Sequence, residues 1–246
     1  MTKAEIQYVR SLADKRMRDS EGVFIAEGDK LVEEIVASGL RIRNLYTTHK
    51  GSQLSGAMLV ERSEMERISQ LKSANTTLAV VEQPRYKLDE RALKDSLVLA
   101  LDGVQNPGNM GTIIRLSDWF GVKDILCSEE CADCYNPKVV QATMGAILRV
   151  RVHYVKDLAA MLKRLNSNGM PIYGTLLDGE NIYTKRLASN GVIVMGNEGR
   201  GLSDGCRATV SDRLFIPPYP IDTPTSESLN VAMATGIVLA EFRRPR

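Results

Sequence analysis

Residues 192–201 read Val-Ile-Val-Met-Gly-Asn-Glu-Gly-Arg-Gly, a run of apolar residues that ends in a glycine-rich turn. β-branched residues favour extended backbone, and an uninterrupted apolar run is typical of a strand buried on both faces of a parallel sheet. The same pattern recurs at residues 97–101, 125–127 and 172–176. Helical patterns lie around these runs, at residues 112–120, 137–148, 158–166 and 229–242. The sequence therefore predicts an α/β fold whose parallel sheet has helices on both faces.

Polar and glycine-bearing segments follow the predicted strands, where open parallel sheets bind ligands. They are residues 102–111, residues 196–201, and residues 228–236 after the segment 215–220. The glycines of 196–201 are spaced G-x-x-G-x-G, whereas a dinucleotide loop needs G-x-G-x-x-G, and the lysine of a phosphate-binding loop is absent. Taken alone, each segment also fits a purely structural turn or helix start, with Ser228 as the expected N-cap of the last helix.

Length and composition indicate a folded protein of one large or two small domains. The chain has 246 residues, or about 1.6 domains at ~150 residues each. A net charge of +2 is too small to indicate a nucleic-acid partner by itself. The apolar runs are far shorter than the roughly 20 residues of a membrane span, and the N-terminus has no secretory pattern. We therefore expect a cytoplasmic protein that has no membrane partner.

A polar stretch with one proline, residues 82–91, separates two regions of alternating helix and strand patterns. We place the domain boundary there, with a small α/β domain at residues 1–92 and a second domain at residues 93–246.

Three blocks in the second region together resemble the motifs of the SpoU (TrmH) class of SPOUT RNA methyltransferases. They are Asn109-x-Gly111-x-x-x-Arg115, residues 196–203, and Ile216-Pro217 with residues 228–231. Residues 131–138 and 144–146 are similar to the class as well, and residues 18–28 resemble the small RNA-binding domain that many members carry. Order and spacing agree across about 150 residues, so the combination is far more specific than any single block.

This resemblance implies methyl transfer from S-adenosylmethionine to a ribose 2′-hydroxyl of structured RNA, ribosomal RNA rather than transfer RNA. It also implies a homodimer with active sites at the subunit interface. The C-terminal SPOUT domain would contain a parallel sheet and a deep trefoil knot, which general topology rules would not have predicted. The RNA, the nucleotide and its base are left open.

The resemblance assigns roles to individual residues. The expected catalytic residues are Arg115, Asn109, Glu198, Ser228 and Asn230. The expected cofactor-binding residues are Leu176, Met195, Gly196, Asn197, Gly199, Ile216, Pro217 and Leu229, and no metal is expected. Because the arginine pKa lies above about 12, Arg115 is expected to orient the substrate and stabilise negative charge. Glu198 is expected to hold either Arg115 or a loop in place.

Two alternatives remain at this point, and one segment departs from the class. Cys127, Cys131 and Cys134 have the C-x3-C-x2-C spacing of radical S-adenosylmethionine enzymes with an iron–sulfur cluster. A non-catalytic RNA-binding assembly factor would keep the same fold. Residues 219–227 form a longer segment than is usual for the class, which leaves the geometry of the cofactor pocket open there.

Overall fold

A computed structural model describes residues 1–220, 226 and 228–245, and the chain packs as two compact units. The first unit combines Met1–Arg85 with Asp133–Leu148, and the second combines Tyr86–Ala132 with Arg149–Arg246. Residues 133–148, which belong to the second region of the sequence, therefore pack with the first unit. The predicted division at residues 92 and 93 concerns functional domains and stays a prediction.

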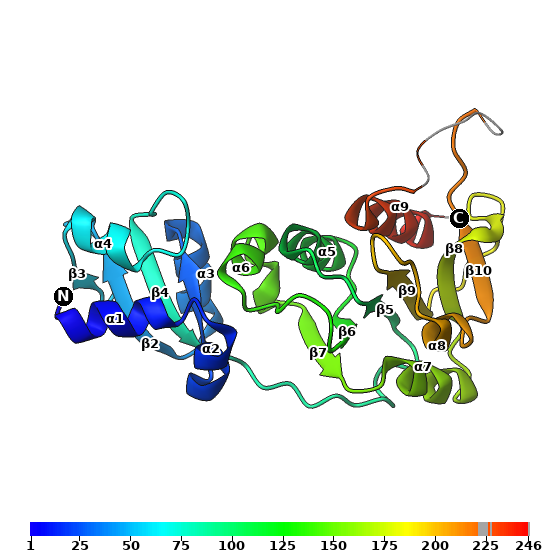
Figure 1. The fold of residues 1–246 in the computed structure, drawn as a ribbon, viewed down its shortest axis with the longest axis horizontal. Coiled ribbons are helices and arrows are strands. Elements are labelled where there is room, and N and C mark those ends of the chain that lie inside the picture. Colours follow the sequence, from blue (N-terminus) through cyan, green and yellow to red (C-terminus); the bar gives the residue numbers. More distant parts are fainter. Residues whose placement is uncertain (221–225, 227, 246) are drawn as a thin grey trace. The chain divides into compact units, whose positions relative to one another are not determined.

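The first unit contains a four-stranded sheet with helices on both faces (Figure 1). Its elements are α1 (Lys3–Ser11), α2 (Lys15–Glu21), β1 (Val23–Glu27), α3 (Asp29–Ser38), β2 (Ile42–Thr47), β3 (Met58–Leu59), α4 (Arg62–Ile68), β4 (Thr77–Glu82), α6 (Pro137–Thr143) and the 3-10 helix Ala146–Leu148. The strand order is β1-β4-β2-β3, with β4 antiparallel to both β1 and β2. Helices α1 and α4 cover one face through Ile6, Val9, Met65 and Ile68. Helices α3 and α6 cover the other.

The N-terminal segment forms two separate helices, because Asp14 caps α2 just after α1 ends. Arg18 of α2 is only 1% exposed, and its guanidinium donates to the carbonyls of Leu12 and Ala13. The same guanidinium forms a 2.5 Å ion pair with Asp133. Arg18 therefore joins the segment 133–148 to the first unit.

The helix predicted at residues 137–148 is shorter than expected. Helix α6 ends at Thr143 because Met144 and Gly145 have φ angles of 50° and 87°, which an α-helix cannot contain. A 3-10 turn follows at Ala146–Leu148.

The second unit is built on a six-stranded sheet in which every neighbouring pair is parallel. Its elements are β5 (Leu97–Asp102), α5 (Pro107–Trp119), β6 (Asp124–Ser128), β7 (Arg151–Val155), α7 (Leu158–Ser167), β8 (Ile172–Asn181), β9 (Gly191–Gly196), α8 (Asp204–Arg207), β10 (Asp212–Phe215) and α9 (Val231–Arg243). The strand order is β10-β8-β9-β5-β6-β7. This confirms the predicted α/β class with a parallel sheet.

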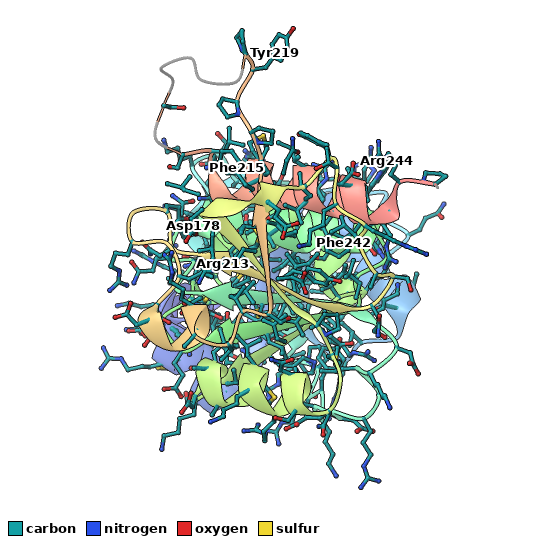
Figure 2. All side chains as sticks on the ribbon, turned by 90° about the vertical axis from the view of Figure 1, so that its right-hand side faces the viewer. Asp178, Arg213, Phe215, Tyr219, Phe242 and Arg244 are labelled. Atoms are coloured by element: carbon teal, nitrogen blue, oxygen red, sulfur yellow. The ribbon has the colours of Figure 1, made fainter. Side chains whose placement is uncertain are left out.

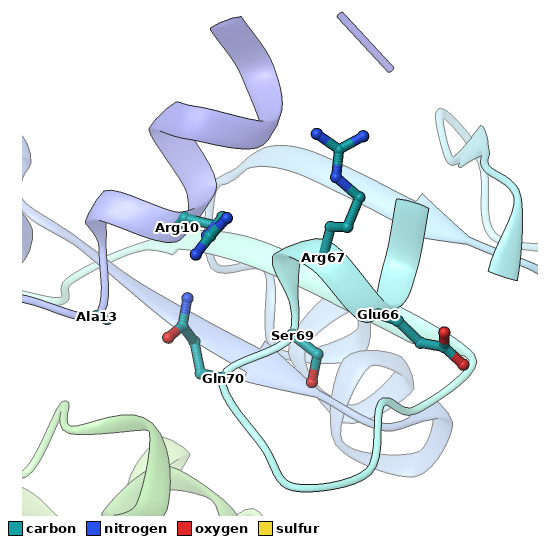
Figure 3. A pocket seen from close by; sticks show the side chains of 6 residues that line it. All are labelled: Arg10, Ala13, Glu66, Arg67, Ser69 and Gln70. Atoms are coloured by element: carbon teal, nitrogen blue, oxygen red, sulfur yellow. The ribbon is translucent and has the colours of Figure 1, made fainter. Parts of the chain in front are cut away.

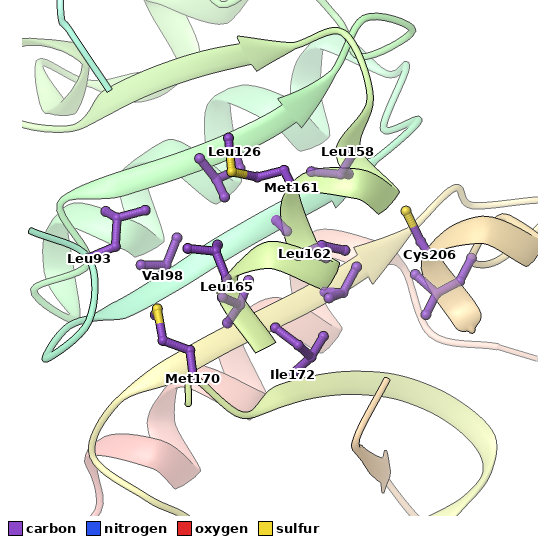
Figure 4. Close-up of a cluster of buried hydrophobic side chains, with 14 residues drawn as sticks. Leu93, Val98, Leu126, Leu158, Met161, Leu162, Leu165, Met170, Ile172 and Cys206 are labelled. Atoms are coloured by element: carbon purple, nitrogen blue, oxygen red, sulfur yellow. The ribbon is translucent and has the colours of Figure 1, made fainter. Parts of the chain in front are cut away.

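Helices lie on both faces of this sheet, with α7 and α8 on one side and α5 and α9 on the other (Figure 1). On the first side, Leu158, Met161, Leu162 and Leu165 of α7 pack against alternate residues of β5 and β9 (Figure 4). The apolar strands are therefore buried on both faces, as their uninterrupted runs predict. No helix among the described residues is long and apolar enough to cross a bilayer.

Parallel strands end at one edge of the sheet, so the segments after β5, β9 and β10 leave from the same edge. The sequence-predicted motifs occupy these segments. Most of the longer segment, residues 221–225 and 227, lies outside the described residues.

Candidate active site

Three side chains from three motifs form a hydrogen-bonded chain at this edge. Asn230 Nδ2 donates to Asn109 Oδ1 at 3.0 Å, and Asn109 Nδ2 donates to Glu198 Oε1 at 2.6 Å. The three residues belong to the start of α9, the first turn of α5 and the loop after β9. The fold therefore brings three of the five predicted catalytic residues into direct contact.

Helix caps place two of these residues. Asn106 caps α5 by accepting hydrogen bonds from the backbone N–H groups of Gly108 and Asn109, and Pro107 fits the first helical position. Asn230 caps α9 in the same way, accepting from Ala232 and Met233. The expected cap at Ser228 is therefore wrong, since the last helix begins at Val231. Ser228 is exposed and lies two residues before the cap.

The loop after β9 is closed by backbone hydrogen bonds that run in both directions between Asn197 and Gly201, each at 2.9 Å. The side chain of Asn197 accepts from the N–H groups of Gly199 and Arg200 and donates to the Gly103 carbonyl at 2.7 Å. A Cβ atom on Gly196 would lie 2.4 Å from the backbone of Gly201, so only glycine fits there. Asn197 therefore joins the two glycine-bearing loops.

Asp102 is a residue of this site that sequence reasoning missed. It ends β5, and its Oδ2 accepts a 2.7 Å hydrogen bond from the backbone N–H of Ser203, 101 residues later. Ser203 in turn caps α8. An acidic residue at a strand end before a glycine was the available signal, but it does not identify the partner.

Arg115 lies on the exposed surface of α5, two turns after the helix start. Within the described ranges its guanidinium has no hydrogen bond and no ion pair. In the described part of the chain, Glu198 is not bonded to Arg115 and instead accepts a hydrogen bond from Asn109. The positive charge of Arg115 is therefore available to an external anion.

The expected cofactor residues lie in the middle of β8 and at or just after the carboxyl ends of β9 and β10. Leu176 lies in β8, Met195 and Gly196 end β9, and Ile216 and Pro217 directly follow β10. Leu229 precedes α9 and is 49% exposed. These residues offer apolar side chains and backbone groups without lysine or arginine. That donor set fits S-adenosylmethionine, which carries an adenine and a carboxylate but no phosphate.

The chain after β10 leaves the sheet before it reaches α9. Figure 2 shows Tyr219 projecting away from the body of the unit, beyond Phe215, and its side chain is 98% exposed. At the strand itself, Arg213 forms a 2.6 Å ion pair with Asp178. Tyr219 therefore makes little contact with the residues that the structure describes.

The cysteines of the alternative interpretation are buried thiols. Cys131 Sγ donates to the Leu101 carbonyl at 3.2 Å. A hydrogen bond with Cys127 lowers the pKa of Cys131 to about 7, although burial raises it. Among the described residues, no three His, Cys, Asp or Glu side chains are placed to hold a metal ion.

Two family models match the chain. Residues 96–240 match the SpoU rRNA Methylase family, and residues 3–84 match an MRM3-like substrate binding domain. Among curated proteins, the 23S rRNA (guanosine(2553)-2′-O)-methyltransferase RlmP of Bacillus subtilis is 28% identical over 241 residues, covering 95% of this chain and 94% of that protein. RlmB of Xanthomonas campestris, a 23S rRNA (guanosine-2′-O-)-methyltransferase, is 37% identical over 160 residues, 65% of this chain and 63% of that protein.

Solved structures extend the similarity over the whole chain. A protein from Porphyromonas gingivalis assigned to the TrmH family of RNA methyltransferases has a TM-score of 0.88 at 36% identity, covering 99% of this chain and 98% of that one. An AdoMet-bound rRNA methyltransferase from Sinorhizobium meliloti has a TM-score of 0.85 at 28% identity, covering 99% and 95%. These matches give no support to the iron–sulfur alternative.

Proposed function

The chain belongs to the SpoU rRNA methylase family, and from that premise we propose that it transfers a methyl group from S-adenosylmethionine to a ribose 2′-hydroxyl of ribosomal RNA. The observation that carries this proposal is the hydrogen-bonded chain from Asn230 through Asn109 to Glu198. It assembles residues of three motifs beside the expected cofactor loops. Relatives named as 23S rRNA 2′-O-methyltransferases support ribosomal RNA as the substrate.

When bound, S-adenosylmethionine supplies a methyl group on a positively charged sulfur. The ribose oxygen gains the methyl group as the sulfur–carbon bond breaks, and the 2′-hydroxyl proton is released. The guanidinium of Arg115 is assigned to stabilising the negative charge that develops on the oxygen and on the adjacent phosphate. The hydrogen bonds among Asn109, Glu198 and Asn230 position the first turn of α5. Arg115 lies farther along the same helix. Ser228, which is exposed and lies two residues before Asn230 in the sequence, is assigned to the substrate side.

Cofactor binding is assigned to the backbone at the carboxyl edge of the sheet. Leu176, Met195, Gly196, Ile216, Pro217 and Leu229 provide apolar surface and backbone hydrogen-bonding groups there. The side-chain atoms of Asn197 and the N–H of Gly199 are already used within the loop. Because the backbone N–H of Asn197 is also bonded, to the Gly201 carbonyl, we assign both residues to shaping the loop that would hold the cofactor.

The first domain, residues 1–92, is assigned to RNA binding, and the second, residues 93–246, to catalysis. A substrate-binding family model over residues 3–84 supports the first assignment. We further propose that the C-terminal stretch forms the trefoil knot of the SPOUT class. Because ribosomal RNA is the substrate, we place the reaction in the cytoplasm.

A homodimer completes the proposal. Trp119 at the end of α5 is 83% exposed, and Met233 in the first turn of α9 is 58% exposed. Helices α5 and α9 pack against each other, so the surface that these two helices form carries Trp119, Met233 and, just before α9, Leu229 as exposed apolar side chains. Exposed aromatic and methionine side chains of this size are enriched at protein interfaces. We assign this surface to a second copy of the chain.

The test is methyl transfer from tritiated S-adenosylmethionine to an unmodified 23S rRNA transcript. The proposal predicts saturable incorporation into the RNA that requires the folded protein. Calorimetry on the same preparation measures cofactor binding. It therefore shows whether a lack of transfer is due to inactive protein or to the wrong RNA. Tight cofactor binding without transfer to this transcript would contradict ribosomal RNA as the substrate.

A further inference from the structure

A cavity of about 460 Å³ lies between α1 and α4 in the first unit (Figure 3). It is lined by Arg10, Ala13, Glu66, Arg67, Ser69 and Gln70. A second cavity of about 340 Å³ adjoins it, lined by Lys3, Ile6, Gln7, Arg10 and Arg67. Because Arg10 and Arg67 line both, the cavities form one surface groove, called here the α1–α4 groove.

The charge of the α1–α4 groove is positive. Lys3, Arg10 and Arg67 line it, and in the described part of the chain their side chains have no hydrogen bond and no ion pair. Glu66 is the one carboxylate among the lining residues, and it is paired with Arg62 of the same helix at 3.1 Å. Three positive charges are therefore available to an anionic ligand.

The floor of the groove is held in place by buried contacts. Ser69 Oγ and the Gln70 backbone N–H donate to the buried carboxylate of Glu27 at 2.6 and 2.7 Å. The side-chain amide of Gln70 donates to the carbonyls of Val9 in α1 and Ile68 in α4. The two walls thus have a fixed spacing before any ligand binds, which reduces the entropy cost of binding.

We propose that the α1–α4 groove binds successive phosphates of the substrate RNA backbone, with Arg10 and Arg67 each contacting a phosphate and Lys3 extending the path. Guanidinium groups match the geometry of phosphate oxygens. The lining contains no aromatic side chain on which a base could stack, so the groove recognises the backbone and not the sequence. This inference rests on the proposed function, because it takes ribosomal RNA as the substrate.

The test measures binding of the full-length protein to an unmodified 23S rRNA transcript by filter binding over a range of KCl concentrations. Arg10→Gln, Arg67→Gln and the double variant remove the charges from the groove. Arg16→Gln is the matched control, because Arg16 is an exposed arginine of α2 outside the lining. Glu66→Gln removes the carboxylate from the lining, so it changes the charge of the groove in the opposite direction.

We expect the double variant to weaken RNA affinity about tenfold, and each substitution to reduce the slope of log affinity against log salt by about 1. Arg16→Gln leaves affinity unchanged, and Glu66→Gln tightens it. Wild-type affinity and salt slope in the double variant would overturn the proposal. Competition by AMP or inorganic phosphate at concentrations that saturate a single site would also overturn it, because the groove would then bind a free small anion.

Methyl transfer by the same variants separates this inference from the proposed function. The double variant is expected to raise the KM for RNA about tenfold, because the groove residues bind RNA and lie in the other unit from the candidate active site. A wild-type protein that binds the transcript through the groove but transfers no methyl group would refute only the proposed function. Full transfer together with unchanged binding in the double variant would refute only the groove.

Discussion

The side-chain amide of Asn109 donates a 2.6 Å hydrogen bond to Glu198, although 89 residues separate them in the chain. The bond connects the first turn of α5 to the loop after β9 and continues to Asn230 at the start of α9. One amide therefore fixes the relative positions of three segments that carry the expected catalytic and cofactor residues.

Asn109→Ala removes both bonds of this chain. We expect the rate of methyl transfer to fall about 10- to 100-fold, because small displacements of catalytic groups are costly. Stability should change little, since each exposed bond contributes about 1 kcal/mol, or a few degrees in Tm at this chain length. Single-turnover kinetics and thermal unfolding measure the two effects.

Glu198 variants provide the control for this prediction. Glu198→Gln keeps an oxygen that accepts the bond from Asn109, whereas Glu198→Leu does not. We expect Glu198→Gln to retain much more activity than Glu198→Leu, and Glu198→Leu to add little to Asn109→Ala. Strictly additive losses would mean that the two residues act independently.

Arg115→Ala tests the role of the exposed guanidinium on α5. The expected loss in kcat is about 100-fold or more, as for removal of one preorganised stabiliser of transition-state charge. Cofactor affinity and Tm should stay near wild type, because the side chain is exposed and has no partner among the described residues. Lys163→Ala, which removes an exposed charge from α7, serves as the control. Turnover like the wild type would exclude the assigned role.

A buried carboxylate at the amino end of β6 makes the stability of the fold depend on pH. Burial raises the pKa of Asp124, but the hydrogen bonds with His153 and Arg151 have the larger, opposite effect. The pKa therefore falls from the usual 3.8 to about 2. This group therefore stabilises the fold above pH 3.8, by about 2 kcal/mol, and the contribution is lost as the pH falls through about 2.

Urea unfolding of Asp124→Asn measures this contribution. The free energy of unfolding should be lower than that of the wild type at neutral pH, and the difference should shrink as the pH falls below about 4. Asp95→Asn, at an exposed position of the same unit, is the control and should show neither effect. A difference that is independent of pH would contradict the assignment.

Trp119 is the only tryptophan of the chain and reports directly on the proposed dimer. We expect light scattering to give the mass of two 27.2 kDa chains. Met233→Arg places a charge on the proposed interface, and it should yield monomers with red-shifted tryptophan emission. Val36→Arg, at an exposed apolar position of α3, should remain dimeric. A monomeric wild-type protein would refute the dimer.

Much of the second unit could be predicted from sequence because its strands are buried on both faces. The apolar runs at β5, β6, β8 and β9 identify those strands directly. β7 was missed because it reads Arg-Val-His-Tyr-Val, and β10 because it starts with Asp-Arg. Edge strands such as these two carry polar residues that mask the pattern.

The geometry of the candidate site could not be predicted from the sequence. Asn109, Glu198 and Asn230 could be named from their motifs, whereas their mutual bonds depend on contacts across 89 and 121 residues. Ser228 and Asn230 are both good N-cap residues, so sequence alone does not choose between them. The α1–α4 groove has no sequence signal, because it depends on how two helices pack.

The position of the transferred methyl group tests the central claim most directly. A 23S rRNA transcript is incubated with the protein and S-adenosylmethionine carrying a deuterated methyl group, digested to nucleosides, and analysed by fragmentation mass spectrometry. We predict that the label stays with the ribose fragment and that Arg115→Ala abolishes it. Label on the base fragment would contradict 2′-O-methylation, whatever the rate of transfer.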